Sequence, residues 1–598
     1  MPVTEPASHA AAPAARGAVR PKLAAQRLPG WLVAATPVAA ELVVGGYRLG
    51  GASLWRDEAY TLAAAGRPAG QIIGLLLHVD AVHGPYYLGM HLVIGLLGSS
   101  AAALRLPSLL ATSLAAGLTA VLGRRLARMS SLPVPALTGI LAGLLYVAAP
   151  QTTWYAQDAR PYGLVTLCAV AASYLLVAAI GDGRRRWWAA YGAAIAVTGV
   201  ASLFALLLLA AHGVTLLLAR ARQRSLPAST ARLRPWLAAS AAAVVVLSPL
   251  IVLGYLQDGT LGWVSRPGLD TAGALVSDFA GSRPLIALAV VAAGCGFALR
   301  LVTGDQAVGD SAARDRALPA ADQAGADLAI GDLAAGRPRG DAGRQPSLAA
   351  GRPRGDAGRQ PSLAAGRPRG DAGRRPAVTV VSVALPWLLL PPLILLAVSL
   401  VKPVYVERYV VFCQPALALL CAAGLAWLGR WIVGSAAGRS IPPLAWAGPL
   451  AILAVAAALL AGPQRAARLT ATRPDNLRDV SAVVAANQRP GDAVFYLPSE
   501  VRVVSMAYPA PFRRLRDLAL LAPPAASDTL TGTQVWAPVL ARRFTRVPRV
   551  WLVQWADQLS VRPDTKIGRE ELVLLSGMRL VRRWTVQSVV LSLYAARQ

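Results

Sequence analysis

Acidic and basic side chains gather where several apolar runs end, and the first such place is Leu54-Trp55-Arg56-Asp57-Glu58. Asp57 and Glu58 cannot face the same way on a helix, because neighbouring residues point about 100° apart. One carboxylate could face a cavity while the other binds basic groups nearby. Equally, the two acids could form an N-terminal pair that interacts with a helix dipole.

The same loop continues into His83-Gly84-Pro85-Tyr86-Tyr87, and His91 follows at helical spacing. Two histidines and a carboxylate could bind a metal ion, but two lone histidines eight residues apart are weak evidence for a metal site. The favoured interpretation is that His83 makes a polar contact with a bound headgroup.

Two later apolar runs end in similar mixtures, at 150–162 and 402–409. A carboxylate can take the proton of an attacking hydroxyl, and Arg or Lys can stabilise the charge that grows on phosphate oxygens. Together the runs therefore suit displacement at a sugar anomeric carbon with a phosphate leaving group. The acids are Asp57, Glu58, Asp158 and Glu407; the bases are Arg160, Lys402 and Arg408; Tyr86 and Tyr162 are aromatic neighbours that could contact a substrate.

The elements that must position these residues cross a membrane. Of the 598 residues, 55% are hydrophobic and only 15% are charged, whereas a soluble protein carries roughly a quarter charged residues. A soluble enzyme, a secreted disulfide scaffold and a disordered protein are excluded as descriptions of the whole chain. The net charge of the chain is +29. In a membrane protein, such an excess of basic residues usually lies in the cytoplasmic loops, so it is not taken as a sign of nucleic-acid binding. The four cysteines lie in apolar runs without metal-ligand spacing.

A membrane-spanning helix needs about 20 apolar residues, and the sequence predicts about eleven of them. The run 188–219 is too long for one span and divides near Ala201–Ser202 into a short pair. The other predicted spans are 31–50, 104–123, 132–149, 161–180, 236–255, 284–303, 377–400, 409–428 and 441–462.

Arginine clusters after alternate spans set the expected orientation. They fall on one side if the first loop, 51–103, stays wholly on the other side, so Tyr86–Gly98 must be a helix at the membrane interface and not a span. The expected protein is a multi-pass protein of the plasma membrane. Its N-terminus is cytoplasmic, and its site and C-terminus are extracytoplasmic.

The membrane core of 31–303 and 377–462 is flanked and interrupted by three other pieces. Residues 1–30 form a basic cytoplasmic tail. Residues 304–376 contain a 15-residue repeat rich in Gly, Pro, Arg and Asp, which cannot bury a core, so they are expected to form a disordered cytoplasmic insert. Residues 463–598 alternate in the way strands do at 493–497, 550–554 and 589–594, and a polar helix precedes them at 476–488. They predict a small extracytoplasmic α/β domain on an otherwise all-α membrane protein.

The chain resembles the C-type membrane glycosyltransferases. The residues that carry the resemblance are Trp55-Arg56-Asp57-Glu58-Ala59, His83-Gly84-Pro85-Tyr86-Tyr87, Arg105-Leu106-Pro107-Ser108, Tyr155 to Leu164, and Glu407-Arg408-Tyr409 followed by Pro415. The most similar branch is glycosyltransferase family 39 with its relatives, the protein O-mannosyltransferases and lipid A aminoarabinose transferases, and the composition is that of a GC-rich, actinobacterial member. The resemblance covers 31–463 apart from the insert.

The resemblance implies an inverting transfer of a sugar from a polyprenyl-phosphate donor at the outer membrane face. It implies that Asp57 is the catalytic base and that Asp158 is the second acid near the site. Mannose is the expected sugar, and a glycan, lipid or protein of the cell envelope is the expected acceptor. A divalent metal ion is possible, but its ligands cannot be assigned. The alternative is a transporter or flippase of a polyisoprenoid-phosphate lipid, whose acids and arginines grip headgroups without catalysis.

Overall fold

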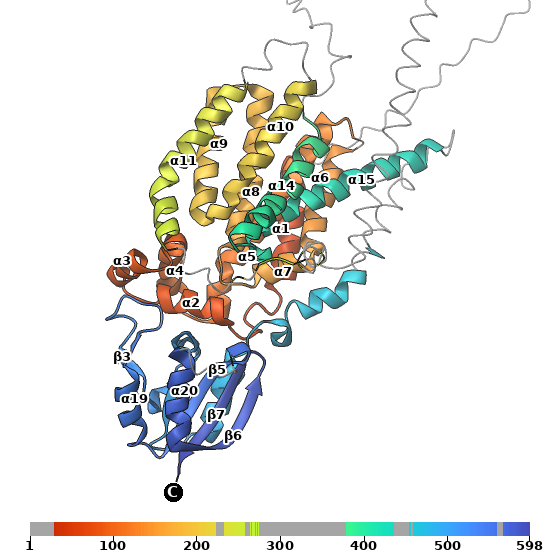
Figure 1. Ribbon diagram of the computed structural model, residues 1–598. Helices are drawn as coiled ribbons and strands as arrows, with labels where there is room; N and C mark the ends of the chain where they lie inside the picture. The colour runs from red at the N-terminus through yellow and green to blue at the C-terminus, as the bar shows by residue number, and fades with distance from the viewer. Residues whose placement is uncertain are drawn as a thin grey trace, which may run out of the picture.

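The structure is a computed structural model that describes residues 29–132, 134–222, 232–257, 378–435, 458–558 and 566–597, together with 264, 266–268, 271, 273, 454 and 455. It has two parts, a bundle of apolar helices and a smaller sheet domain at one end of the bundle (Figure 1). The predicted insert 304–376 and the predicted span 284–303 lie outside the described residues, as do residues 1–28 of the predicted tail and most of 441–462.

Six helices in the described part of the chain are long and apolar enough to cross a membrane, and a bent pair makes up to seven. The pair α6 and α7 bends by 68° at Ala149, where Pro150 starts the second helix. The long helices are α5 (Ala101–Met129), α8 (Tyr162–Asp182), η2 with α10 (Leu203–Leu207 and Leu208–Arg222), α11 (Leu233–Leu256), α14 (Val380–Val401) and η5 with α15 (Glu407–Cys413 and Gln414–Ser435); the bent pair is α6 (Pro135–Ala148) with α7 (Pro150–Ala156).

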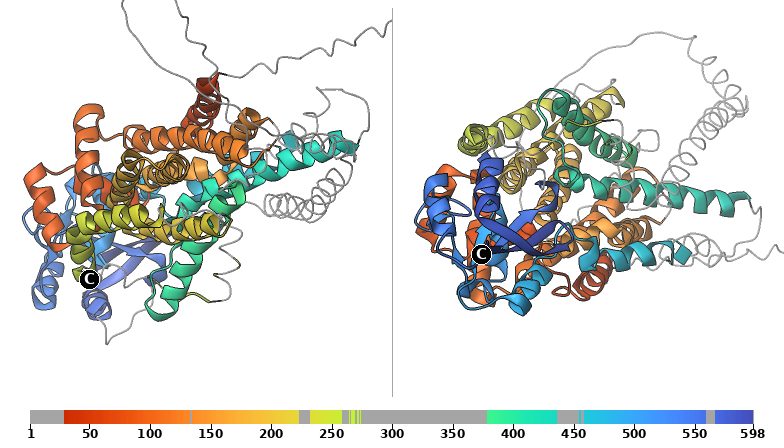
Figure 2. Two further views of the ribbon diagram at one scale, coloured as in Figure 1. Left: turned by 90° about the horizontal axis from the view of Figure 1, so that it is seen from above. Right: turned by 60° about the horizontal axis from the view of Figure 1, so that its bottom comes forward.

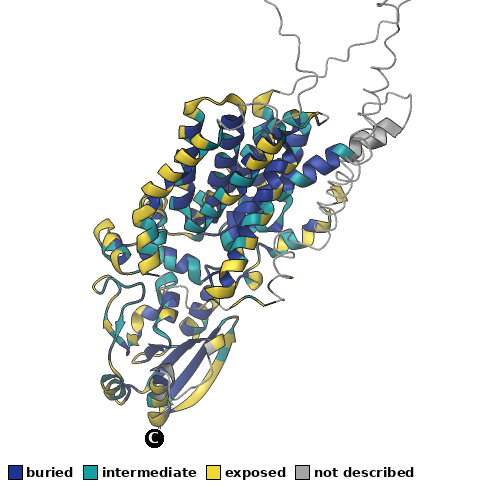
Figure 3. Ribbon diagram, turned by 45° about the horizontal axis from the view of Figure 1, so that its top comes forward, coloured by how far each residue is buried: buried dark blue, intermediate teal, exposed yellow. Residues whose placement is uncertain are grey.

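Two of the predicted spans form helices of only 17 residues, α1 (Gly30–Gly46) and α9 (Arg185–Ala201). The predicted division of 188–219 is confirmed, because α9 ends at Ala201 and the chain turns at Ser202 into η2. Figure 3 shows buried residues along the inside of the bundle and exposed ones on its outside. The outer face of α11 exposes Val245 and Val246, as a helix that faces lipid does. The chain is a multi-pass membrane protein.

The first loop folds into short helices at the end of the bundle next to the sheet domain (Figures 1 and 2). The helix predicted at Tyr86–Gly98 is present and has 14 residues, fewer than the roughly 20 that a span needs. The loop elements are α2 (Arg56–Ala65), α3 (Ala69–His78), η1 (Ala81–His83) and α4 (Gly84–Leu97).

The C-terminal part contains a mixed five-stranded sheet in the order β2-β1-β5-β7-β6 and a two-stranded sheet, β3-β4. The three predicted strands are present as β1, β5 and β7, and the predicted helix is α17. The strands are β1 (Ala493–Tyr496), β2 (Arg516–Asp517), β3 (Leu520–Ala522), β4 (Thr533–Gln534), β5 (Arg549–Trp555), β6 (Met578–Val586) and β7 (Val589–Ala596). The helices are η6 (Thr470–Thr472), α17 (Leu477–Asn487), η7 (Ser499–Arg502), α18 (Val503–Ala507), η8 (Phe512–Arg514), α19 (Ala537–Phe544), η9 (Ala556–Gln558) and α20 (Lys566–Gly577).

Alternation along β1 and β5 sends side chains to both faces of the sheet. Val494 and Trp551 belong to one apolar cluster, and Phe495 and Leu552 belong to another. Ala59 of α2 is a buried member of the first cluster. The helix that carries Asp57 is therefore packed into the core of the sheet domain.

Candidate active site

Asp57 and Glu58 occupy the first turn of α2, and Glu58 is completely buried. Arg105 of α5 donates to both of its carboxylate oxygens, from Nε to Oε1 at 2.6 Å and from Nη2 to Oε2 at 2.7 Å. The backbone N–H of Ala159 donates to Oε1 at 3.0 Å. Burial alone would raise the pKa of Glu58, but the charge of Arg105 and its hydrogen bonds outweigh burial and hold this pKa below its ordinary value.

Arg105 is also completely buried, and it uses its remaining donors on the first loop. These donors bind the backbone oxygens of Leu49, Ala52 and Ser53 at 3.0, 3.2 and 3.1 Å. The Glu58–Arg105 pair therefore joins α2, α5, the start of the loop and the α7–α8 turn. All three guanidinium nitrogens of Arg105 donate to oxygens of the protein, so the pair is a structural lock.

Asp57 faces a different neighbour, Arg408 of η5. Nη2 of Arg408 lies 3.7 Å from Oδ2 of Asp57, and the two side chains are 17% and 15% exposed. Trp55 flanks this arginine, with its ring 5.9 Å from the guanidinium carbon. The separation is long for a hydrogen bond, so the Asp57 carboxylate keeps room for another partner.

Asp158 lies in the α7–α8 turn and is completely buried. Trp55 Nε1 donates to its Oδ1 at 3.0 Å, whereas its Oδ2 has no hydrogen-bond partner. Burial and the nearby charge of Glu58 raise the pKa of Asp158 to about 7. A carboxyl group with a pKa near 7 is present in both its protonated and its ionised form at neutral pH.

Arg160 lies two residues further along and is held by a relay of two side chains. Its Nη2 donates to Nε2 of His83 at 3.0 Å, and Nδ1 of His83 lies 2.7 Å from Oδ1 of Asp80. Because Nε2 accepts, the proton of a neutral His83 ring sits on Nδ1 and is donated to Asp80. Tyr87 donates to the other oxygen of Asp80. Burial would lower the pKa of Arg160, but the charge of Asp57 and other groups nearby raises this pKa well above its ordinary value.

Several buried polar atoms at this place have no protein partner. They are Oδ2 of Asp158, Nε of Arg160 and the hydroxyl of Tyr162. Buried polar atoms are normally hydrogen-bonded, so three exceptions in five residues of the chain mark a site that a ligand could complete. Tyr162 packs edge-on against Tyr155 at 5.2 Å, and both rings contact the η5 segment through Val411.

The predicted site residues are brought together only in part. Asp57, Asp158, Arg160, Tyr162 and Arg408 converge between α2, the α7–α8 turn and η5. His83 supports Arg160, and Tyr86 packs with Leu54 and Met90. Lys402 and Glu407 are exposed, and Nζ of Lys402 lies 5.7 Å from the ring of Tyr255 on α11.

The donor set does not fit a metal ion. His91 binds the backbone oxygen of Ala65 through Nδ1, and both ring nitrogens of His83 are engaged by Asp80 and Arg160. Among the residues that the structure describes, no three His, Cys, Asp or Glu side chains form a group that could hold a metal.

Three site neighbours were missed in the sequence. Asp80 lies only three residues before His83, and this spacing could have indicated their contact. Asp475 accepts from Nε and Nη2 of Arg56 at 3.1 Å each, and Arg473 binds the backbone oxygen of Gln157. These last two contacts join positions more than 300 residues apart, and no local sequence pattern predicts them.

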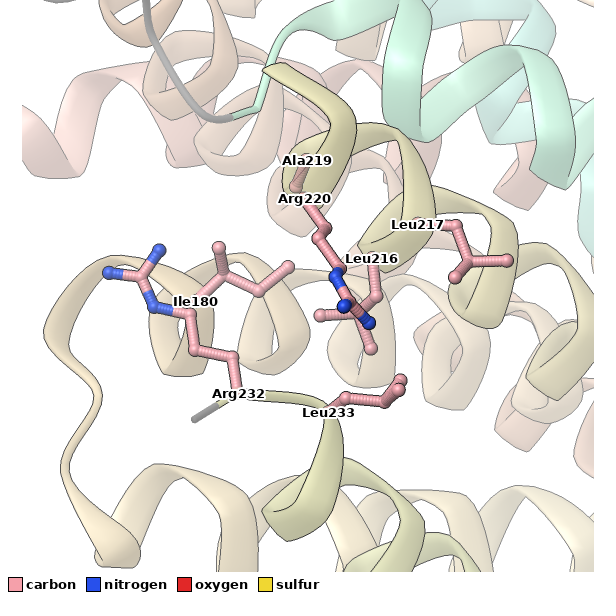
Figure 4. A pocket seen from close by; sticks show the side chains of 7 residues that line it. All are labelled: Ile180, Leu216, Leu217, Ala219, Arg220, Arg232 and Leu233. Atoms are coloured by element: carbon pink, nitrogen blue, oxygen red, sulfur yellow. The ribbon is translucent and has the colours of Figure 1, made fainter. Parts of the chain in front are cut away.

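A pocket lies elsewhere, where α8 and α10 end and α11 begins (Figure 4). Arg220 and Arg232 are among its lining residues. It is at the end of the bundle away from the sheet domain (Figure 1), so it is separate from the cluster around Asp57.

Comparison with known proteins gives a fold and no sequence family. No protein-family model matches the chain, and no curated protein matches it by sequence. Among solved structures it is similar to ArnT from Cupriavidus metallidurans in the apo state, with a TM-score of 0.50 and 15% identity over 94% of this chain and 98% of that one. The same enzyme bound to undecaprenyl phosphate gives a TM-score of 0.48 and 14% identity over the same shares. The chain therefore has an ArnT-like fold, a bundle of apolar helices with a small sheet domain at its C-terminus.

Proposed function

We propose that the protein transfers a sugar from a polyprenyl-phosphate donor to a hydroxyl of a cell-envelope glycan, lipid or protein, on the extracytoplasmic side of the membrane. The observation that carries the proposal is the contrast within one helical turn. Glu58 is locked to Arg105, whereas Asp57 is partly exposed beside Arg408 and within the field of Arg160. A carboxylate base next to two guanidinium groups suits the transfer of a sugar from a phosphate, because the guanidinium groups can stabilise the charge of the phosphate that leaves.

The proposed reaction is a direct displacement with Asp57 as the base. Its carboxylate takes the acceptor proton as the acceptor oxygen bonds to the anomeric carbon. The bond from that carbon to the phosphate oxygen breaks, and its electron pair stays on the phosphate. Arg408 and Arg160 stabilise the charge that develops there. Attack from the side opposite the phosphate inverts the anomeric carbon.

Arg408 can serve the phosphate because its contact with Asp57 is loose. At 3.7 Å, this pair is longer than a charge-assisted hydrogen bond of about 2.7–2.9 Å. A donor phosphate can therefore draw the guanidinium toward itself and leave the Asp57 carboxylate to the acceptor. The unpartnered Nε of Arg160 and hydroxyl of Tyr162 are further donors for an oxygen-rich ligand.

Asp158 takes the role of a second acid in this proposal. Its free Oδ2 can accept a hydrogen bond from a substrate hydroxyl, and Trp55 fixes the orientation of the carboxylate. The ionised form accepts such a bond best.

The choice of donor is supported by the fold that the chain shares with ArnT and by the C-type motifs in its sequence. Mannose is the sugar to test first, on the resemblance to protein O-mannosyltransferases alone. The acceptor is left to experiment.

The test is incubation of the purified full-length protein with polyprenyl-phosphate mannose and total envelope lipid, followed by mass spectrometry. The parent should give a hexose-modified product and free polyprenyl phosphate, and Asp57→Asn should give neither. Asp479→Asn is a matched control, because Asp479 is exposed in the first turn of α17. No product with any polyprenyl-phosphate sugar, together with lipid translocation that survives Asp57→Asn, would favour a transporter instead.

A further inference from the structure

Arg473 is a buried cation that comes from outside the helical bundle. It follows η6 on the way into the sheet domain, yet its side chain is only 2% exposed. The guanidinium carbon lies 4.1 Å from the centre of the Trp154 ring on α7, and Nη2 donates to the backbone oxygen of Gln157 at 2.9 Å. Gln157 immediately precedes Asp158, so Arg473 reaches the turn that carries the second acid.

The backbone that presents Arg473 is fixed from two sides. Nε2 of Gln587, in the turn between β6 and β7, donates to the backbone oxygens of Thr470, Ala471 and Arg473 at 3.0, 3.2 and 3.1 Å. The backbone N–H of Ser53 in the first loop donates to Oγ1 of Thr470 at 3.1 Å. The sheet domain and the first loop therefore determine together where this arginine lies.

The buried guanidinium group of Arg473 makes fewer hydrogen bonds than a buried charged group normally does. Nε and Nη1 are buried and have no hydrogen-bond partner. A buried charge is costly unless it is paired, and an arginine retained with one hydrogen bond must be compensated by charge. Two buried carboxylates act on this charge, Glu58 more strongly than Asp158. Glu58 is already paired with Arg105, whereas Arg473 is the strongest cation acting on Asp158.

We infer that Arg473 is a positioning residue of the site, which holds the α7–α8 turn and offsets part of the cost of a negative charge on the buried Asp158. Through it, the sheet domain contributes to the active centre, although the bundle and the first loop supply the residues that would touch substrate. The inference rests on the proposed function for its meaning in catalysis, but the ionisation of Asp158 can be measured without turnover.

The electrostatics of Asp158 agree with the geometry. Burial and Glu58 raise its pKa to about 7, and Arg473 opposes them, followed by the Trp55 hydrogen bond and Arg160. Without the charge of Arg473 this pKa should rise further, so that Asp158 is protonated at neutral pH. The charged and titratable groups around Asp158 are Glu58 on α2, Tyr86 on α4, Arg105 on α5, Tyr155 on α7, Arg160 in the turn and Arg473.

The experiment is a pH titration of the Asp158 carboxyl group by difference infrared spectroscopy on the full-length protein, with Asp158→Asn to assign the band. Arg473→Gln should move the titration upward by roughly one pH unit or more, the usual effect of one nearby charge. Arg473→Lys keeps the charge and should restore most of the shift. Arg514→Gln is the control, because Arg514 is exposed in the sheet domain.

Gln587→Ala keeps the inference testable if Arg473→Gln does not fold, since it removes the three backbone contacts without touching the site. It should give a smaller shift in the same direction. An Asp158 titration that stays in place in both variants would overturn the inference. A shift in a protein that transfers no sugar would uphold it and reject the proposed function alone. If transfer occurs, the acidic limb of its pH profile should move with the infrared titration.

Discussion

The two carboxylates of the first turn of α2 have opposite surroundings. Glu58 is held by short hydrogen bonds: Arg105 donates to both of its oxygens, and the backbone N–H of Ala159 donates to one of them. Around Asp57, the ion pair with Arg408 is long, and the neighbouring Asp158, Arg160 and Tyr162 keep buried polar atoms without partners. Two adjacent residues can therefore have different roles, one in stability and one in catalysis, since they point to different sides of a helix.

The largest effect on stability is expected from Glu58. Glu58→Gln removes the charge that compensates the buried Arg105, and breaking a buried pair in this way costs about 3–5 kcal/mol. Thermal unfolding of the purified protein should show the loss. In Glu58→Gln combined with Arg105→Met, the loss should be smaller than the sum of the two single losses, because the unpaired charge is gone. Independent, additive losses would show that the two side chains do not act as a lock.

The next prediction concerns Arg408, which lies beside the partly exposed Asp57. Arg408→Ala should lower transfer by about 10²–10³-fold, the usual cost of removing a donor that stabilises developing charge. Arg408→Lys should retain part of the activity and should need more donor to reach half of its maximal rate. Lys offers only a point charge, whereas Arg can donate two parallel hydrogen bonds to a phosphate. Steady-state kinetics against donor concentration measures both. Full activity in the Ala variant would transfer the phosphate role to Arg160.

Asp158, which lies near Asp57, should make the stability of the protein depend on pH. Its pKa is raised from 3.8 to about 7, so the folded protein holds a proton there that the unfolded chain has already lost. Its contribution to stability is therefore greatest below pH 4 and is lost as pH rises toward 7. The unfolding midpoint of the parent should fall more than that of Asp158→Asn between pH 5 and pH 8. Equal slopes for the two proteins would contradict the raised pKa.

Transfer should follow the opposite trend with pH. If ionised Asp158 accepts a substrate hydroxyl, activity should rise as pH passes through about 7. Asp158→Asn should lose this rise together with much of the activity.

The smallest effect is expected from the insert 304–376, which lies outside the described residues. Its repeats cannot bury a core, and the predicted orientation places it on the face opposite the site. Replacement by a short Gly/Ser linker should leave membrane insertion and transfer near the parent level. A large loss in either assay would reveal a functional element in the repeats.

Much of the fold follows from local pattern. Apolar length predicts the long helices, and period-two alternation predicts β1, β5 and β7. Strand β6 (Met578–Val586) was missed because five successive residues from Arg579 to Arg583 are exposed, which destroys the alternation of a half-buried strand. The bend between α6 and α7 was also missed, although Pro150 restricts the residue before it.

The site is less visible in the sequence than the fold. Asp57, Asp158 and Arg160 could be predicted because each follows or precedes an apolar run. The division of labour between Asp57 and Glu58 could be argued from helix geometry, but the partner of each could not. Arg473 and Asp475 were out of reach, since their contacts depend on how the sheet domain docks on the first loop.

The most direct test of the central claim compares Asp57→Asn with Glu58→Gln in two assays, turnover per folded molecule and unfolding midpoint. Asp57→Asn keeps the size of the side chain and removes its basicity, so turnover should fall by at least about 10²-fold, the lower end of what a general base contributes, with donor affinity and unfolding midpoint close to the parent. Glu58→Gln should lower the midpoint strongly, and its remaining folded molecules should turn over faster than those of Asp57→Asn. The reverse pattern, with Asp57 needed for stability and Glu58 for turnover, would contradict the assignment of the lock and the base.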